Sequence, residues 1–346
     1  MHPRYELKDV DRRFWEERLE AWLPKRVVDA HRHISRPEHV DPVTLGKSGT
    51  NWATEVGSEE SLEEAAIGYA ELFPGREVSY LAFGTPYPEG HTEEMNAYLS
   101  EGVRGTGSAA LALVRPEWTP EQVLEQLRQP GILGLKPYMG MWAGWQGGDC
   151  SIFEYMTHEH LALLDELGGW LTLHIPRGER LADPANIKEI LELRQRYPRL
   201  VLVVAHLGRA YAGRYAREGF RALEREEGLL WDTSAVLNPA VLTLALDRLG
   251  PEKLLWATDL PILYMRGRRR WEGDQYINLT SGDYSWNTQR EAPEVEAGYT
   301  LYLYESLAAL VDAAVQLGYG AAELEAILHE NARRKMDEVA ARKGQW

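Results

Sequence analysis

Residues 170–206 have the sequence WLTLHIPRGERLADPANIKEILELRQRYPRLVLVVAH, which joins two apolar runs through a longer amphipathic segment. The two runs, 170–174 and 200–206, are short and rich in Leu and Val, as buried strands are. Between them, Asp183 precedes Pro184, a pairing typical of a helix start, and the apolar residues that follow have helical spacing. This stretch therefore predicts a strand, a helix and a second, parallel strand.

The same alternation continues in both directions along the chain. Eight apolar runs are predicted strands, at 26–34, 78–85, 109–114, 132–137, 170–174, 200–206, 229–234 and 254–259. Helical patterns follow at about 62–73, 92–103, 120–127, 155–167, 184–197, 215–227, 239–249 and 300–317. Strands that are apolar throughout indicate a parallel sheet covered on both faces, and eight repeats favour a (β/α)8 TIM barrel. The alternative is a doubly wound open sheet, although no GxGxxG follows the first strand to support its Rossmann version.

The composition favours a soluble, globular protein of enzyme size with a large core. The chain has 346 residues, 44% of them hydrophobic, and its 38 Lys and Arg against 53 Asp and Glu give a net charge of −15. Such a charge disfavours nucleic acid and anionic membranes as partners. Because we find no signal sequence and no apolar run of transmembrane length, we expect a cytoplasmic location. The single cysteine, Cys150, leaves any metal site to His, Asp and Glu.

We expect a single domain over residues 1–346, with an N-terminal helix at about 10–23 and a C-terminal helix at about 321–341. Long segments follow strands 1, 4 and 8, at 35–61, 138–153 and 260–298, and loops of such length are usually functional. The last segment carries Trp271 and Trp286, so we expect a lid whose indoles contact the substrate. The alternatives are an interface in a homo-oligomer such as a dimer, or a surface insertion.

Polar residues that bind metals close several of the predicted strands. His31 and His33 end the first strand on one side of it, while Arg32 points the other way and is expected to be structural. His174, His206 and Asp259 end strands 5, 6 and 8. Catalytic residues of TIM barrels lie at these strand ends, and four histidines and a carboxylate buried there would need partners. A shared divalent cation would satisfy them all.

The chain resembles the amidohydrolase superfamily, and within it the amidohydrolase-2 group that includes aminocarboxymuconate-semialdehyde decarboxylase. The motifs that carry the resemblance are DAHRHI, GLKPY, LTLHIP, VVAHLG, ATDLP and HENARRKM, in that order. The resemblance implies His31, His33, His174 and Asp259 as metal ligands, with His206 holding or polarising the metal-bound water or the substrate. The motif ATDLP departs from relatives that have Gly before Thr or Ser, and it keeps the aspartate.

The predicted cofactor is one divalent metal. Nitrogen and oxygen ligands suit Zn2+ best and also admit Mn2+, Fe2+ or Co2+. Bound Zn2+ can lower the pKa of water from about 15.7 to about 7. We expect Asp259 to take the proton from this water and His206 to stabilise the developing oxyanion.

Basic residues at the strand ends predict a small, anionic substrate. Lys136 ends strand 4, where it could contact a substrate carboxylate, form an ion pair, or carry the carbamate that bridges two metals in other members of the superfamily. Arg177 and Arg209 follow His174 and His206 and can grip a carboxylate through a planar fork.

Three functions stay open at this point. The first is a hydrolase in which metal-activated water attacks a lactone, ester or amide. The second is a non-oxidative, metal-dependent decarboxylase of an aromatic or unsaturated acid, which shares every ligand with the first. The third is a catalytically silent binding barrel, which would not need to keep all five metal-site positions.

Overall fold

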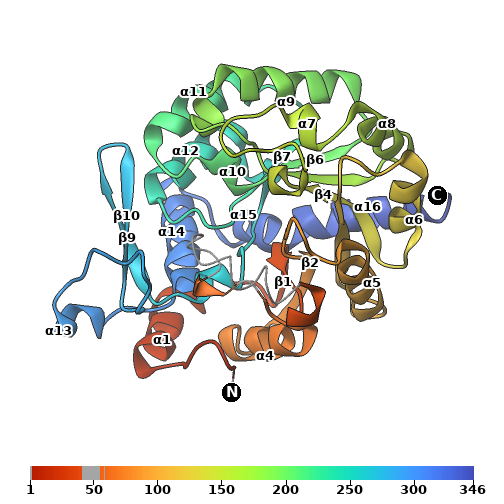
Figure 1. The fold of residues 1–346 in the computed structure, drawn as a ribbon. Coiled ribbons are helices and arrows are strands. Elements are labelled where there is room, and N and C mark those ends of the chain that lie inside the picture. The colour runs from red at the N-terminus through yellow and green to blue at the C-terminus, as the bar shows by residue number, and fades with distance from the viewer. Residues whose placement is uncertain (1, 41–54, 58) are drawn as a thin grey trace.

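The computed structural model describes residues 2–40, 55–57 and 59–346. Its centre is a sheet of eight parallel strands in the order β1 to β8, each paired with the next along the chain (Figure 1). The strands are β1 (Arg26–His33), β2 (Glu77–Phe83), β3 (Ala109–Val114), β4 (Ile132–Pro137), β5 (Trp170–Leu173), β6 (Val201–Val204), β7 (Leu229–Asp232) and β8 (Leu254–Leu255). The backbone N–H of His33 donates to the carbonyl of Leu260, so the segment after β8 pairs with β1 and closes the sheet. The predicted (β/α)8 barrel is confirmed.

Helices surround this barrel. They are α1 (Asp9–Phe14), α4 (Leu62–Leu72), α5 (Thr92–Gly102), α6 (Pro120–Arg128), α7 (Ile152–Tyr155), α8 (His158–Leu167), α9 (Pro184–Arg196), α10 (His206–Arg209), α11 (Gly213–Leu223), α12 (Pro239–Leu249), α13 (Pro293–Glu296), α14 (Tyr302–Gln316), α15 (Ala321–Glu325) and α16 (Asn331–Lys343). The π-helical segments η1 (Trp15–Leu19) and η7 (Ala326–Glu330) extend α1 and join α15 to α16. As predicted, α9 begins at Pro184, and the Asp183 side chain accepts hydrogen bonds from its first turn. Within the described residues, no helix is long and apolar enough to span a bilayer.

Two apolar clusters hold the barrel together, and the alternation of side chains along each strand separates them. Val28 and Ala30 of β1 point inward, into a cluster shared with residues such as Leu111 and Leu255. An irregularity in the pairing of β1 with β2 between Asp29 and Arg32 interrupts the alternation, so His31 also points inward, against Phe83 of this cluster. Met336 of α16 joins this inner cluster. The larger outer cluster packs the other faces of the strands against the helices. Polar side chains at the strand ends are therefore held on a rigid, fully packed support.

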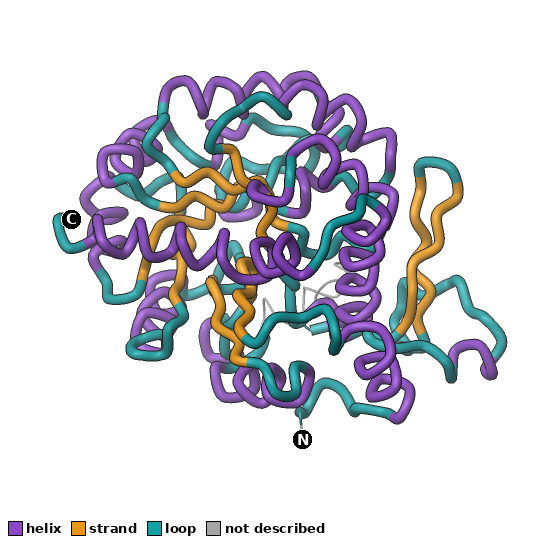
Figure 2. Tube along the Cα trace, turned by 180° about the vertical axis from the view of Figure 1, so that it is seen from behind, coloured by secondary structure: helices purple, strands orange, loops and turns teal. Residues whose placement is uncertain are grey.

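The long segment after β8 has secondary structure of its own. It contains the short helix η6 (Ile262–Tyr264) and an antiparallel hairpin of β9 (Gly267–Glu272) and β10 (Gln275–Thr280), followed by α13. Figures 1 and 2 view the molecule from opposite sides, and both show the hairpin standing beside the ring of helices. Most of the predicted long segment at 35–61 lies outside the described residues.

Candidate active site

Two neighbouring histidines and an aspartate distant in the sequence meet at the C-terminal end of β1. His31 and His33 leave this strand on the same side, and Asp259 follows β8. Asp259 Oδ1 lies 3.3 Å from His31 Nε2 and 3.4 Å from His33 Nε2. The structure therefore brings three of the predicted metal ligands together.

The second ring nitrogen of each histidine is already engaged. His31 Nδ1 lies 2.9 Å from Asp232 Oδ2, and His33 Nδ1 lies 3.1 Å from the carbonyl oxygen of Gly84. Since both partners can only accept, both Nδ1 atoms carry the proton, and the lone pairs at Nε2 face Asp259. His31 Nε2 is buried without a hydrogen-bond partner in the described part of the chain. Two nitrogen lone pairs and a carboxylate that converge in this way fit a divalent metal ion.

The other two predicted histidines lie beside this group. The ring of His206 is 4.7 Å from that of His31, and the ring of His174 is 5.4 Å from that of His206, measured between centroids. Among the described residues, donor atoms within 4.8 Å of one another form two sets, His31 with His33 and Asp259, and His31 with His206 and Asp232. His174 belongs to neither set, but its buried Nδ1 has no hydrogen-bond partner in the described residues.

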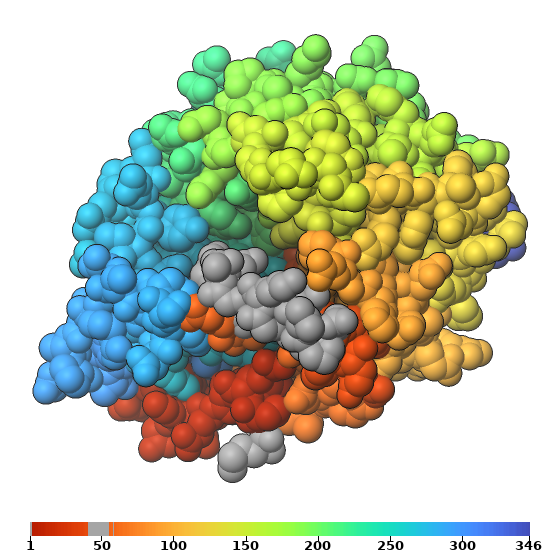
Figure 3. Space-filling model, viewed as in Figure 1, coloured from red at the N-terminus to blue at the C-terminus, as the bar shows by residue number. Residues whose placement is uncertain are grey.

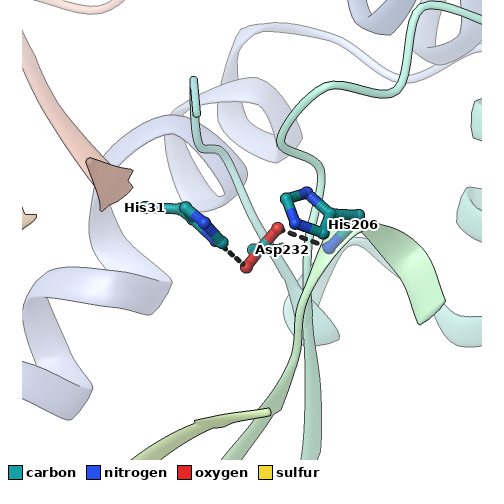
Figure 4. A group of neighbouring side chains, drawn as sticks. All are labelled: His31, His206 and Asp232. Atoms are coloured by element: carbon teal, nitrogen blue, oxygen red, sulfur yellow. Dashed lines mark hydrogen bonds and ion pairs between the residues drawn. The ribbon is translucent and has the colours of Figure 1, made fainter. Parts of the chain in front are cut away.

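Asp232 is a site residue that the sequence analysis missed. It ends β7, is fully buried, and lies between His31 and His206 (Figure 4). The sequence held a signal, since the run 229–234 ends in Trp-Asp-Thr-Ser and places an acidic residue where the other strands place histidines. β7 therefore also contributes a polar side chain, Asp232, to the site.

Unusual backbone conformations gather around the same strand ends. Positive φ angles occur at His206 (56°), Leu207 (49°) and Arg209 (57°), at Ala235 (56°) after β7, and at Asp259 (66°) after β8. Residues other than glycine are sterically disfavoured in this left-handed region because of their Cβ atom. Such strain is concentrated at functional sites, where the surrounding fold enforces a special geometry.

The charge states follow from burial and from the close contacts. Burial lowers the pKa of His33 and brings the pKa of His206 to about 4, so both rings are neutral near pH 7. Burial alone would raise the pKa of Asp259, but His206 and His31 hold it well below its usual range. Burial and Lys136 act to lower the pKa of His31, yet Asp232 raises it. The site therefore offers neutral rings at His33 and His206 and an ionised Asp259, the forms that bind metals, whereas the raised pKa of His31 means that a bound metal must displace a proton from this ring.

Lys136 ends β4 as a fully buried cation. Within the described residues its Nζ has no hydrogen-bond partner, so the ion pair considered from the sequence does not form there. The ammonium group lies 4.8 Å from the ring centroid of Phe83 and 5.6 Å from that of Tyr138. Burial lowers the pKa of Lys136 to about 8, against the opposing effects of Asp232 and Asp259.

A cavity of about 580 Å3 opens beside these groups. Its lining includes His33, His174, Tyr138, Trp145 and Arg209. Lys136 is not among the described lining residues, but it lies against the ring of Tyr138, which is one of them. One Arg209 nitrogen, Nη1, donates to the carbonyls of residues 175–177, which fixes the guanidinium at the wall. Apolar walls with a few fixed polar groups are typical of small-molecule sites.

Other residues predicted to bind the substrate lie away from this cavity. Arg177 is not among the described lining residues, because its guanidinium forms a bidentate ion pair with Glu189 of α9. Trp271 and Trp286 are not among them either. The indole of Trp271 donates to the carbonyl of Tyr211, and that of Trp286 stacks on Tyr284.

The segment predicted to be a lid reaches the cavity only at its start. Pro261 and Ile262 contribute to the lining, whereas the hairpin does not. The space-filling view shows the light-blue segment that includes the hairpin at the left edge of the face (Figure 3). The expectation that this segment contacts the substrate through its two indoles therefore has no support in this geometry.

Comparison with known proteins agrees with this arrangement. The amidohydrolase family model matches residues 28–335, which spans the barrel from β1 to α16. The chain belongs to the amidohydrolase family. The resemblance inferred from the strand-end motifs is thereby confirmed, and none of the curated protein sequences matches this amidohydrolase significantly.

Solved structures with the same fold include both hydrolases and decarboxylases. An amidohydrolase from Burkholderia multivorans with bound zinc has a TM-score of 0.59 and 14% identity, over 90% of this chain and 99% of its own. A candidate 2-pyrone-4,6-dicarboxylic acid hydrolase from Pseudomonas putida has a TM-score of 0.56 and 16% identity, over 91% and 98%. A 5-carboxyvanillate decarboxylase from Novosphingobium aromaticivorans, complexed with manganese and 4-hydroxy-3-methoxy-5-nitrobenzoic acid, has a TM-score of 0.55 and 14% identity, over 90% and 96%. At such low identities, the TM-scores show a shared fold alone.

Proposed function

We propose that this amidohydrolase is a metal-dependent hydrolase that adds water to a carbonyl of a small, carboxylated substrate, such as a lactone, ester or amide. The observation that carries the proposal is the convergence of two histidine Nε2 lone pairs on Asp259 Oδ1. His174 is the proposed fourth ligand. Zinc in one structure of this fold and manganese in another support a divalent ion, with Zn2+ as our choice and Mn2+, Fe2+ or Co2+ as alternatives.

The metal, when bound, would acidify a water molecule and polarise the substrate carbonyl. Asp259 is ionised at neutral pH, so it can accept a proton from the attacking water. His206 Nδ1 lies 3.2 Å from the carbonyl oxygen of Ser234 and therefore carries the ring proton. Its Nε2 then accepts a hydrogen bond from the water, which differs from the oxyanion contact expected from the sequence.

The cations at the site support an anionic substrate. Lys136 is buried without a hydrogen-bond partner in the described residues, and Arg209 is fixed at the cavity wall. A carboxylate would give Lys136 the hydrogen-bond partner that it lacks among the described residues. The aromatic rings of Tyr138 and Trp145 would contact a flat, apolar body.

Decarboxylation of an aromatic or unsaturated acid is the second candidate. The observation that favours it is the burial of Lys136 against two aromatic rings, because a carboxylate held there would lie in a dry, apolar setting. The 5-carboxyvanillate decarboxylase has the same fold. The two candidates differ in product, since the hydrolase forms a new acid and the decarboxylase releases CO2.

One experiment tests both candidates. Metal-free protein is reloaded with Zn2+ or Mn2+ and assayed on pyrone carboxylates, other lactones, aryl esters, N-acyl amino acids and hydroxybenzoates. The blank is the Asp259→Asn variant. We expect metal-dependent acid release from a carboxylated lactone, ester or amide. Release of CO2 from a hydroxybenzoate would establish the second candidate, and a protein with stoichiometric metal and no turnover would favour the binding barrel.

A further inference from the structure

The carboxylate of Asp232 connects three strands at the site. It leaves the end of β7 and is completely buried. Its Oδ2 lies 2.9 Å from Nδ1 of His31, which comes from β1. Its Oδ1 accepts the backbone N–H of His206, after β6, at 2.8 Å. Figure 4 shows Asp232 between the two histidines.

Ser234 extends this contact to the ring of His206. Its hydroxyl donates to Asp232 Oδ1 at 2.5 Å, and its backbone N–H reaches the same oxygen at 3.2 Å. Because the hydroxyl proton is given to Asp232, the Ser234 Oγ that lies 2.9 Å from His206 Nδ1 can only accept there. His206 must then carry its proton at Nδ1, as His31 does.

We propose that Asp232 is a positioning residue that holds His31 and His206 in their Nδ1–H forms, so that both Nε2 lone pairs face the metal site. The inference rests on the proposed metal site. Carboxylates that accept from the second nitrogen of a histidine ligand fix both its ring orientation and its tautomer. Here one carboxylate acts on two histidines, directly on one and through a serine on the other.

A competing arrangement makes Asp232 itself a ligand, together with His31 and His206. Four donors already occupy its two oxygens, and metal binding would displace at least one of them. It would also require His31 to bind through Nδ1, which would leave Nε2 facing Asp259 without a metal. The observed geometry satisfies Asp232 and leaves His31 Nε2 unsatisfied, which favours the positioning role.

The Asp232→Asn variant distinguishes a positioning carboxylate from a mere space filler. Three donors converge on Oδ1, so the asparagine oxygen must stay there and its NH2 group must face His31. The amide then donates to His31 Nδ1, which forces the ring proton onto Nε2 and blocks the lone pair aimed at the metal.

The measurement is the zinc Kd, obtained by competition with a chromophoric chelator. We expect Asp232→Asn to raise it about tenfold to a hundredfold. Ser234→Ala keeps the acceptor for His31 and should change it less than about threefold. Asp11→Asn is a matched control, since Asp11 is also buried and accepts from Arg266 and Thr300. An Asp232→Asn Kd within twofold of the wild-type value would overturn the proposal.

A second measurement needs no variant at Asp232. Long-range 1H–15N spectra of the zinc-loaded wild-type protein report which nitrogen of His31 is protonated, with its signals assigned by their loss in His31→Asn. We expect a proton on Nδ1 and metal on Nε2. The reverse pattern would make Asp232 part of the ligand set and refute the positioning role. Neither readout requires a substrate, so a failed substrate search leaves this test intact.

Discussion

The buried polar side chains on the two faces of β1 differ in the partners that they contact. On the outer face, Arg32 donates to Glu60 and to the Tyr264 hydroxyl, and its guanidinium lies 4.6 Å from the Tyr69 ring centroid. On the inner face, His31 Nε2 is equally buried but has no hydrogen-bond partner among the described residues. His31, a proposed ligand, is thus followed directly by Arg32, a structural cation, because successive side chains point to opposite faces.

This difference between the two faces separates buried polar residues that stabilise the fold from those that bind a ligand. A buried charge that serves the fold is paired, as Arg32 is with Glu60, which also contacts His2. Arg32 Nε and Nη1 are also buried without a hydrogen-bond partner in the described residues, but a guanidinium can only donate, whereas the unpartnered Nε2 of His31 can bind a metal and faces Asp259. We therefore expect mutations on the outer face to lower stability, and mutations on the inner face to remove metal.

The largest expected effect is the loss of metal from the inner face. His33→Asn removes an Nε2 that lies 3.4 Å from Asp259 Oδ1, so one of few ligands is lost. Elemental analysis should give one divalent ion per wild-type chain and almost none in the variant. A variant that kept a full ion would show that the site lies elsewhere.

The next effect is a loss of stability from the outer face. Glu60→Gln leaves Arg32 buried without its counter-charge and should lower the free energy of unfolding by about 3–5 kcal/mol. Urea unfolding of the metal-free protein measures this change. The folded variant should still hold one metal per chain. If the free energy of unfolding fell by less than about 1 kcal/mol, or if the folded variant lost its metal, the two faces would not differ in the way proposed.

A smaller effect is expected at Lys136, which faces the site without being a proposed ligand. Lys136→Met should keep the metal and raise KM for a carboxylated substrate about tenfold to a hundredfold, because a charged hydrogen bond is lost. Lys343→Met is the matched control, since its pKa is also about 8 and it contacts Leu127 away from the cavity. A fall from two metals to one would instead indicate a bridging carbamate on Lys136.

The same lysine predicts a pH dependence. With a pKa of about 8, Lys136 is cationic below that pH and loses its proton as the pH rises through it. The wild-type KM for a carboxylated substrate should therefore rise above about pH 8, and the Lys136→Met KM should stay flat over the same range. Parallel pH profiles for the two proteins would exclude Lys136 as the substrate contact.

The smallest effect is expected in the hairpin. Trp271→Phe removes the hydrogen bond to the Tyr211 carbonyl and should cost about 1 kcal/mol of stability. Since Trp271 does not line the cavity, kcat/KM should change less than about threefold. A tenfold fall in kcat/KM at unchanged metal content would restore the lid that the sequence suggested.

The barrel could be predicted from the sequence because its strands and helices follow from local patterns of apolar residues. Apolar runs at 109–114 and 132–137 have the same bounds in the structure, since such runs need only to be buried to form strands. The run at 254–259 shortens to two strand residues, because the chain after Leu255 turns into the site and Asp259 adopts a positive φ.

The candidate site was predictable where a residue type at a strand end decides it. His31, His33, His206 and Asp259 come together because parallel strands of a barrel end at one face. Arg177 could not be placed in this way, since its partner Glu189 lies on the following helix and their pairing depends on how that helix packs. The hairpin did have a local signal, because Gly273 and Asp274 form a two-residue turn between β9 and β10.

We propose that the inner face of β1 holds a divalent metal through Nε2 of both histidines. Crystals of zinc-loaded protein, with anomalous difference maps on either side of the zinc edge, test it most directly. We predict one peak at about 2.0–2.2 Å from His31 Nε2, His33 Nε2 and an Asp259 oxygen, with Asp232 outside that distance. A peak bound by Asp232 and His31 Nδ1, or no peak between β1 and Asp259, would refute this metal site.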